Sequence, residues 1–402
     1  MASLNNTNID FRKRWLLNEV LGSGAYGKVY RARSATNSSL AAVVKVFYIN
    51  DAKSAQSIMS GFIAEVVIQM YAAEASKALC KDVVCMLVNE FGVQQEAYAS
   101  PSTAGLEAYI VLSDSDPGEP LKDAIEYVSG APSMASPTVR AIAAVEQRPL
   151  RIAASLARNV LALHNAGIAH LDLKPDNILL LDADPKRTKL IDLGLACIDT
   201  SRLDIAQRHV KHVQDVLLAR FGAGTLASNS YSMSAASALR SFKARELLTC
   251  ATYRGTPPYH SVAMKLPGGS SSSKKAFTYG SSQDVYALGI IVQELFLGRL
   301  AGTKTFRSSG GGSAPTSEQL DRVRNSALFK VRTLAQQRAI AAEYTDALVI
   351  MPQQLLAADI VTGGKLYELV NSMIGILVRG KPEISLADAS TKLSNLATLA
   401  KQ

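Results

Sequence analysis

The hydrophobic positions in the N-terminal part of the chain fall into short runs that are typical of β-strands. Two such runs cover residues 15–21 and 29–32. A third, residues 40–47, is apolar apart from the single Lys45, and a fourth lies at 109–112 just before a polar stretch. We expect these runs to form strands.

Later segments carry signals that are typical of helices. A helix is predicted to end near residues 161–168, where Gly167 supplies the usual stop signal. The longest apolar run, around residues 285–297, contains Gln293 and Glu294 and is too short to span a bilayer. A further helix is predicted from apolar residues that share one helical face, namely Ala206, Val210, Val213, Leu217 and Phe221.

Three segments have a composition that predicts mobile or disordered chain. Residues 222–241 are rich in Gly, Ala and Ser, and residues 268–282 and 308–317 are similarly biased. No internal repeat is visible in the sequence.

The strongest chemical signal is the string H-L-D-L-K-P-D-N at residues 170–177, followed by I-D-L-G at 191–194. The two strings resemble the catalytic loop and the metal-binding loop of a protein kinase. In such loops Asp172 would act beside an attacking hydroxyl group, and Asn177 and Asp192 would hold the metal ions that bridge ATP phosphates. An Asp and an Asn at this spacing are common in solvated loops. The complete string, by contrast, rarely arises as a by-product of folding.

A second motif lies near the N-terminus, where residues 21–30 read L-G-S-G-A-Y-G-K-V-Y. A G-x-G-x-x-G-x-V run is weak evidence by itself, because glycine-rich hairpins serve many folds. Here it lies between two predicted strands and not between a strand and a helix. This context favours a flap over ATP phosphates and argues against a dinucleotide-binding fold.

In this order the motifs resemble those of the eukaryotic-type Ser/Thr protein kinases, and the resemblance runs from about residue 15 to about residue 396. It implies an α+β, bilobal fold with a small β-rich N-lobe and a larger helical C-lobe. The implied division is a tail at 1–14, an N-lobe at 15–112 and a C-lobe at 113–398 that includes an activation-segment insertion at about 199–250.

The resemblance implies an ATP site in the N-lobe. By itself, Lys45 would be interpreted as an edge-strand lysine with its head in water; in this family it grips the α and β phosphates. Its expected partner is Glu65, with Glu74 as the weaker alternative. The ATP-binding residues that the resemblance implies are Gly22, Gly24, Gly27, Val29, Val43, Lys45, Glu65, Leu112, Asp114 and Leu179.

The resemblance also assigns the catalytic groups. Asp172 would orient and deprotonate the acceptor hydroxyl, and Lys174 would offset charge at the γ-phosphate. Asn177 and Asp192 would hold Mg²⁺. Thr256, within R-G-T-P-P-Y at 254–259, would lie near Asp172. The implied activity is Mg²⁺-ATP-dependent phosphorylation of Ser or Thr in protein substrates.

The implied C-lobe contains one further residue, Asp284, which is expected to cap the backbone of the catalytic loop. Two departures mark the chain as a divergent member. Leu171 replaces the Arg that pairs with an activation-loop phosphate in most kinases. Constitutive or otherwise gated activity is therefore expected, unless Lys243, Arg245 or Arg254 supplies the docking cation instead. The segment from Asp192 to Gly255 is far longer than an ordinary activation segment. Such embellished kinases are common in viral and other fast-diverging lineages.

Composition adds expectations about environment. The cysteines are few and scattered, which predicts reduced thiols in the cytoplasm or nucleus; they are Cys80, Cys85, Cys197 and Cys250. The N-terminus lacks a signal-peptide pattern, so no membrane partner is expected. The net charge of +9 is spread over the chain, which favours a solvated basic surface; nucleic acid is not indicated.

Two alternative functions remain. A pseudokinase scaffold would keep the fold but normally loses the phosphate-binding Lys, the catalytic base or the metal-binding Asp, and none of these is lost here. A small-molecule kinase of the aminoglycoside or choline type shares the Asp-x-x-x-x-Asn pattern. It lacks the Gly-Thr acceptor loop and the Lys after the base, which this chain has at Thr256 and Lys174.

Overall fold

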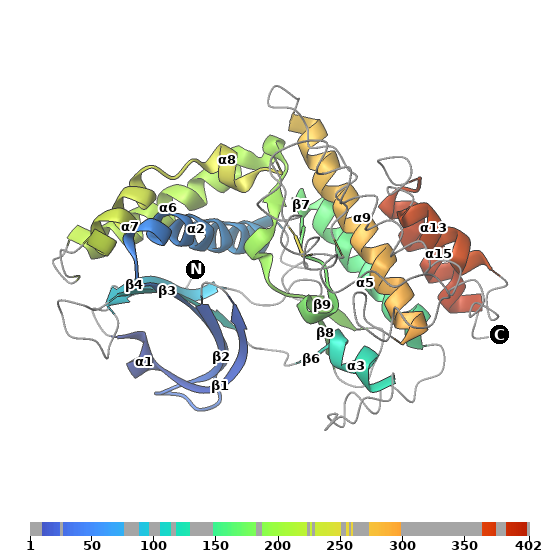
Figure 1. Ribbon diagram of the computed structural model, residues 1–402, viewed down its shortest axis with the longest axis horizontal. Coiled ribbons are helices and arrows are strands. Elements are labelled where there is room, and N and C mark those ends of the chain that lie inside the picture. Colours follow the sequence, from blue (N-terminus) through green and yellow to red (C-terminus); the bar gives the residue numbers. More distant parts are fainter. Residues whose placement is uncertain are drawn as a thin grey trace, which may run out of the picture. The chain divides into compact units, whose positions relative to one another are not determined.

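A computed structural model describes most elements of the chain (Figure 1). The residues that it describes are 10–24, 27–75, 88–95, 105–113, 118–128, 148–181, 187–222, 226, 230–250, 255–256, 259, 273–298, 364–374 and 383–399. The predicted disordered segment at 308–317 lies outside them.

The described residues fall into two compact units. The first is drawn from Met1–Lys81, Cys85–Pro117 and Thr200–Thr249, and the second from Asp82–Val84, Gly118–Asp199 and Cys250–Gln402. A five-stranded antiparallel sheet comes first along the chain and mostly helical structure follows. The predicted α+β fold class is therefore confirmed.

The sheet of the first unit has the strand order β1-β2-β3-β5-β4. Its central strands, β3 and β5, are buried along almost their whole length, which explains why they are nearly continuous apolar runs in the sequence. The strands are β1 (Trp15–Gly24), β2 (Gly27–Ser34), β3 (Ala41–Ile49), β4 (Val88–Gln95) and β5 (Leu106–Ser113).

A short helix, α1 (Phe11–Arg14), precedes β1 and is anchored on the sheet. The ring of Phe11 stacks on Tyr109 of β5 with their centroids 4.4 Å apart. Arg12 is paired with Glu107 of β5, and Arg14 is paired with Glu90 of β4. These contacts tie the start of the chain to strands that come much later in the sequence.

Helix α2 (Ala52–Ala75) contacts the sheet on one side and further helices on the other. Most of its side chains are therefore apolar and buried, and near its start a short exposed stripe is formed by Lys53, Gln56, Ser57 and Gly61. By length and composition alone α2 would suit a membrane span. However, 67% of its apolar window is buried inside the protein, so α2 is a core helix of this unit.

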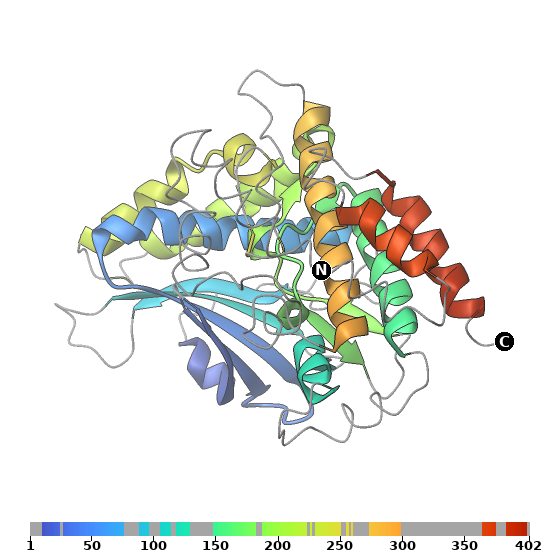
Figure 2. The same ribbon diagram turned by 45° about the vertical axis from the view of Figure 1, so that its right-hand side comes forward.

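The inserted segment supplies the helices that cover α2, and Figures 1 and 2 show them running alongside it. They are α6 (Leu203–Gly222), α7 (Ser230–Arg240) and α8 (Ala244–Leu248). The predicted helical face of α6 is buried at Ala206, Val210, Val213 and Leu217, and half-buried at Phe221. The sequence placed this segment in the C-lobe, whereas its apolar side chains pack in the first unit.

The prediction of a mobile segment at residues 222–241 was wrong for most of its length. Helix α7 forms there because alanine has the highest helix propensity and because Ala235, Ala238 and Leu239 become buried. A Gly-, Ala- and Ser-rich composition predicts mobile chain, but small residues also suit a helix that packs closely on a neighbour.

The second unit is built around helices α5 (Arg148–Asn165) and α9 (Ser273–Leu297), which contact each other. α5 also contacts α15 (Leu386–Leu399), and α9 contacts α13 (Lys365–Ile374). α9 begins inside the segment 268–282 that was predicted to be disordered, so that prediction was wrong from Ser273 onward.

Short strands in the second unit hold the loops that carry the chemistry. β7 pairs with β10, and β8 pairs with both β6 and β9. A helical turn, Pro175–Asn177, connects the loop after β7 to β8. The remaining elements are α3 (Leu121–Val128), β6 (Gly118–Pro120), β7 (Ile168–Ala169), β8 (Ile178–Leu181), β9 (Thr188–Leu190) and β10 (Cys197–Ile198).

The glycines of the β1–β2 hairpin allow a direct test of how β2 packs against β3 in the first unit. A Cβ atom at Gly27 would lie 1.9 Å from the backbone oxygen of Val46, whereas a Cβ at Gly22 would meet nothing within 4 Å. We expect Gly27→Ala to lower the free energy of unfolding by about 1–3 kcal/mol, because the strand must shift. Gly22→Ala should change it by less than about 0.5 kcal/mol. Urea unfolding of both variants checks this, and equal losses would contradict the described register.

Candidate active site

The first unit places Lys45 and Glu65 together. Lys45 lies on central strand β3, and Glu65 lies on the face of α2 that packs on the sheet. The Nζ of Lys45 donates to Oε1 and Oε2 of Glu65 at 3.0 and 2.8 Å. The Glu65 side chain is only 4% exposed, so this carboxylate depends on Lys45 for compensation of its charge.

Glu74, the alternative partner, is engaged elsewhere. Its Oε1 lies 3.0 Å from Nη2 of Arg208, and its Oε2 lies 2.7 Å from Nε2 of His209. Both partners belong to the inserted helix α6. Glu74 therefore links α2 to the insertion, two to three turns along the helix from the carboxylate that holds Lys45.

The glycine hairpin presents open space. A Cβ atom at Gly22 or at Gly24 would meet no other atom within 4 Å, so packing within the protein does not explain these two glycines. Gly27 differs, since only a glycine fits against β3 there. Glycines without a packing role are suited to a loop whose backbone must approach a ligand closely.

The apolar residues among the predicted ATP-binding set are mostly buried. Val43 and Leu112 are register partners on β3 and β5 and are each 6% exposed, and Val29 is half-buried on β2. Leu179 lies on β8 of the second unit. Asp114 lies outside the described residues.

In the second unit, the carboxylate of Asp172 is surrounded by three polar side chains. It accepts a hydrogen bond from Oγ1 of Thr256 at 2.5 Å and one from Nζ of Lys174 at 2.8 Å. Nδ2 of Asn177 donates to Oδ2 of Asp172 at 3.0 Å and to its backbone oxygen at 2.9 Å. Lys174 also donates to Thr256 at 3.2 Å, which closes the network.

The backbone beneath Asp172 is held by Asp284 of α9, which is completely buried. Its Oδ2 accepts from the backbone N–H of His170 at 2.7 Å, and its Oδ1 accepts from that of Leu171 at 2.8 Å. Nε2 of His164 lies 2.8 Å from the same Oδ2. This is the capping role that the sequence predicts for Asp284, and His164 is the partner that sequence reasoning missed.

The side-chain oxygens of Asn177 and Asp192 are of the type that binds a Mg²⁺ ion. Both Nδ2 hydrogen bonds of Asn177 go to Asp172, which directs its amide oxygen elsewhere, and Ile191 N–H donates to the Asn177 backbone oxygen at 3.0 Å. The loop that carries Asp192 therefore runs beside Asn177. Mg²⁺ prefers oxygen ligands and is commonly held by one or two protein groups plus phosphates. Within the described ranges no cluster of three or more His, Cys, Asp or Glu offers a site of another kind.

The sequence matches the family profile described as "Protein kinase domain" over residues 15–311, which is more than half of the chain. The protein belongs to the protein kinase family. It is also similar to human "Myosin light chain kinase family member 4", with 26% identity over 183 residues. That similarity covers 44% of this chain and 37% of the human protein, so it spans less than half of either.

This kinase departs from the family pattern at Leu171, whose backbone has a φ of 63°. Left-handed backbone is unfavourable for a leucine and is sustained here because both its neighbour His170 and Leu171 itself donate to Asp284. The Leu171 side chain is 4% exposed and packs against Ala169, Cys197 and Cys250. An apolar cluster therefore occupies the position beside Asp172 where most kinases have an arginine.

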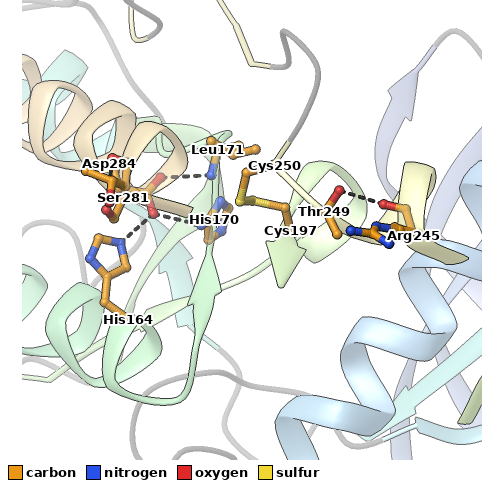
Figure 3. Close-up of a disulfide and its surroundings, with 10 residues drawn as sticks. His164, His170, Leu171, Cys197, Arg245, Thr249, Cys250, Ser281 and Asp284 are labelled. Carbon is orange, nitrogen blue, oxygen red and sulfur yellow. Dashed lines mark hydrogen bonds and ion pairs between the residues drawn. A yellow bond between two sulfur atoms is a disulfide. The ribbon is translucent and has the colours of Figure 1, made fainter. Parts of the chain in front are cut away.

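Cys197 and Cys250 form a disulfide, with their Cα atoms 5.2 Å apart (Figure 3). The prediction of four reduced, scattered thiols was therefore wrong for this pair. The two cysteines are 53 residues apart in sequence, and no spacing rule points to their pairing. They meet because the chain between them leaves the second unit after Asp199 and returns at Cys250.

A second contact that the sequence did not reveal lies just after the acceptor loop. The hydroxyl of Tyr259 donates to Oε1 of Glu294 on α9 at 2.7 Å. Burial raises the pKa of Tyr259 well above its ordinary value of 10.0, and the Glu294 carboxylate raises it further. The phenol therefore remains a donor at every physiological pH and ties Tyr259 to α9.

The anchoring by Asp284 can be tested without any assay of catalysis. Asp284→Ala leaves two buried amides without an acceptor, and each should cost about 1–3 kcal/mol. We expect a lower free energy of unfolding and faster hydrogen exchange at the His170 and Leu171 amides. The matched control is Asp176→Ala, because Asp176 is exposed and its Oδ1 has only a long contact, 3.4 Å, with Nζ of Lys122. Unchanged exchange at both amides in Asp284→Ala would contradict the capping role.

Proposed function

We propose that the protein is a Ser/Thr protein kinase that transfers the γ-phosphoryl group of Mg²⁺-ATP to hydroxyl groups of protein substrates. The observation that carries this proposal is the network at Asp172, where Lys174, Asn177 and Thr256 all donate to one carboxylate or its backbone. The network joins the expected base to the lysine and to the acceptor-segment threonine, which are the groups that phosphoryl transfer to a hydroxyl requires.

Asp172 is the group that would orient the acceptor hydroxyl and take its proton. Asn177 fixes the carboxylate by donating to Oδ2, so the other oxygen, Oδ1, faces Thr256. The Thr256 hydroxyl occupies a position from which it donates to Asp172, as a substrate Ser or Thr hydroxyl must also do. This contact supports the proposal that a substrate hydroxyl held beside Thr256 can reach the Asp172 carboxylate.

The remaining charged groups are suited to phosphate. Lys174 lies 2.8 Å from Asp172 and would offset negative charge on the transferring group. Lys45, held by Glu65, would position the α and β phosphates, and the glycine hairpin with open space at Gly22 and Gly24 would cover them. Asn177 and Asp192 would hold Mg²⁺, which supplies charge neutralisation between phosphates.

Two observations favour Ser/Thr proteins over other acceptors. Lys174 follows the base by two residues, and the Thr256 hydroxyl reaches both Lys174 and Asp172. These are the features that a small-molecule kinase of the aminoglycoside or choline type lacks. The similarity to a human protein named as a myosin light chain kinase family member points in the same direction.

A scaffold without phosphoryl transfer is the second candidate, because Leu171 departs from the family pattern beside the base. The assembled Lys45–Glu65 pair and Asp172 network argue against it, since a scaffold has no need to keep both. Activity measurements decide between the two.

Asp172→Ala should lower phosphorylation of a Ser/Thr peptide library by roughly 10²–10⁴-fold, because a positioned base is lost. Lys45→Ala and Asp192→Ala should be nearly inactive as well. Transfer of radiolabelled phosphate from Mg²⁺-ATP is the measurement. Asp176→Ala is the matched control in the same loop, since its side chain is 50% exposed, and it should retain activity. Equal background labelling by the wild type and all these variants would leave the scaffold as the better explanation.

Control of activity is expected to depend on the insertion and not on an activation-loop phosphate. With Leu171 in place of arginine, a phosphate gains no charge-assisted hydrogen bond at that position. Phosphatase-treated enzyme should therefore keep most of its activity. Val213→Asp places a charge in the buried face of α6 on α2, the helix that carries Glu65, and should lower activity roughly 10–100-fold.

The matched control for Val213→Asp is Ala219→Asp, which adds the same charge to an exposed position of α6. It should behave like the wild type. A large loss of activity after phosphatase treatment, restored by autophosphorylation, would overturn this account. So would equal effects of the two aspartate substitutions.

A further inference from the structure

We propose that the Cys197–Cys250 disulfide is a redox control point of this kinase: the oxidised form holds the catalytic loop in its working arrangement, and reduction to two thiols lowers turnover. The activity readout rests on the proposed Ser/Thr kinase function. The structural readout described below does not depend on it.

The position of the disulfide in the chain is the first argument. Cys197 lies on β10, where it pairs with Ala169 of β7, and Ala169 directly precedes the catalytic loop. Cys250 is the residue at which the chain returns to the second unit after the excursion of Thr200–Thr249. The bond therefore fixes both ends of the excursion at one place, immediately beside the loop that carries Asp172.

The contacts of the disulfide are the second argument. Cys197 and Cys250 are both fully buried, and they form one apolar cluster with Ala169 and Leu171, against which Phe277 of α9 packs. Figure 3 shows Leu171 beside the disulfide, with its backbone N–H directed to Asp284. Leu171 thus contacts the sulfur cluster through its side chain and Asp284 through its backbone, and Asp172 is the next residue.

The lack of spare volume is the third argument. A Cβ atom added to Gly280 of α9 would lie 2.8 Å from Sγ of Cys250, 3.1 Å from Sγ of Cys197 and 3.2 Å from Cβ of Ala169. Bonded sulfurs are about 2.05 Å apart, whereas non-bonded heavy atoms prefer roughly 3.5–4.0 Å. Two thiols therefore need more room than the disulfide, and the atoms that must yield include those of Ala169 and Leu171.

The redox chemistry is an exchange of two electrons. In the oxidising direction the thiols of Cys197 and Cys250 lose two protons and two electrons, an S–S bond forms between them, and a low-molecular-weight disulfide RSSR is reduced to two RSH. A dithiol reductant reverses the step. Because both sulfurs are buried, exchange requires local opening and is expected to be slow. In a reducing compartment the thiol form prevails, so oxidation would raise activity.

The presence of Leu171 where most kinases have an arginine gives a physical reason for control by the Cys197–Cys250 disulfide. A charged side chain beside Asp172 allows a phosphate to order the neighbouring segment through an ion pair. Leu171 cannot do this, but it can transmit packing from a sulfur cluster. A covalent bond between residues 197 and 250 would then order the ends of the long segment that a phosphate orders elsewhere.

The test compares one wild-type preparation in two redox states. The disulfide state is verified by peptide mapping under non-reducing conditions, and turnover is measured after oxidation with oxidised glutathione, after reduction with dithiothreitol, and after re-oxidation. We expect reduction to lower kcat roughly 10–100-fold with a smaller change in the KM for ATP, and re-oxidation to restore it. Unchanged kcat between verified oxidised and reduced forms would overturn the proposal.

Variants separate this pair from the other thiols. Cys197→Ser and Cys250→Ser should resemble the reduced wild type and should not respond to dithiothreitol. Cys80→Ser and Cys85→Ser are the matched controls and should respond like the wild type. If the response to dithiothreitol persists in both Cys197→Ser and Cys250→Ser, a different thiol is responsible and the proposal fails.

Hydrogen exchange keeps the proposal testable if a serine variant folds poorly or if no kinase activity is found. In the wild type, reduction should accelerate exchange of the His170 and Leu171 amides, which donate to Asp284 in the described state. Absence of activity in both redox states together with this acceleration would refute the proposed function and leave the redox coupling supported. Equal exchange in both states, or free thiols at Cys197 and Cys250 under oxidation, would refute the coupling itself.

Discussion

The catalytic loop depends on one buried carboxylate, that of Asp284. Its two oxygens accept the backbone N–H groups of His170 and Leu171 at 2.7 and 2.8 Å, so a left-handed residue is held immediately before Asp172. A buried carboxylate is tolerable only when its lone pairs are satisfied, and each buried amide likewise requires an acceptor. The two backbone amides satisfy the Asp284 carboxylate, and the carboxylate supplies the acceptors that the amides need. This anchoring fixes the backbone that directs Asp172 toward Lys174, Asn177 and Thr256.

The first unit contains a comparable dependence at Glu65. Its carboxylate is buried on α2 and is compensated by Lys45, so the position of α2 decides whether the lysine is held. In this chain α2 is covered by helices of the inserted segment, and Glu74 binds Arg208 and His209 of α6. The insertion therefore acts as a built-in partner for the helix that carries Glu65. The inserted segment, Thr200–Thr249, lies between two segments of the second unit in the sequence but contributes to the core of the first unit.

The failures of sequence reasoning have specific physical causes. The Gly-, Ala- and Ser-rich composition of residues 222–241 predicts mobile chain, yet the same small residues pack closely in α7 when a partner helix such as α2 is available. The few, scattered cysteines predict reduced thiols, whereas the return of the chain after the excursion brings Cys197 and Cys250 together although they are 53 residues apart. In each case the deciding partner is remote in sequence.

Periodicity in the sequence predicted β1, β2, β3 and β5 of the first unit but not β4. The spacing within the loop predicted that Asn177 and Lys174 lie near Asp172, whereas the fold class and the meeting of Thr256 with Asp172, 84 residues away, were implied by the resemblance to protein kinases. Periodicity also predicted the apolar face of α6 at Val213 and Leu217, which is a property of one helix. The sequence also ranked Glu65 ahead of Glu74 as the partner of Lys45, and the structure shows that contact. Only the tertiary structure decided where the face of α6 packs and that two cysteines close the inserted segment. Those outcomes depend on contacts between distant segments, and local pattern carries no information about which of several compatible partners the folded chain brings within reach.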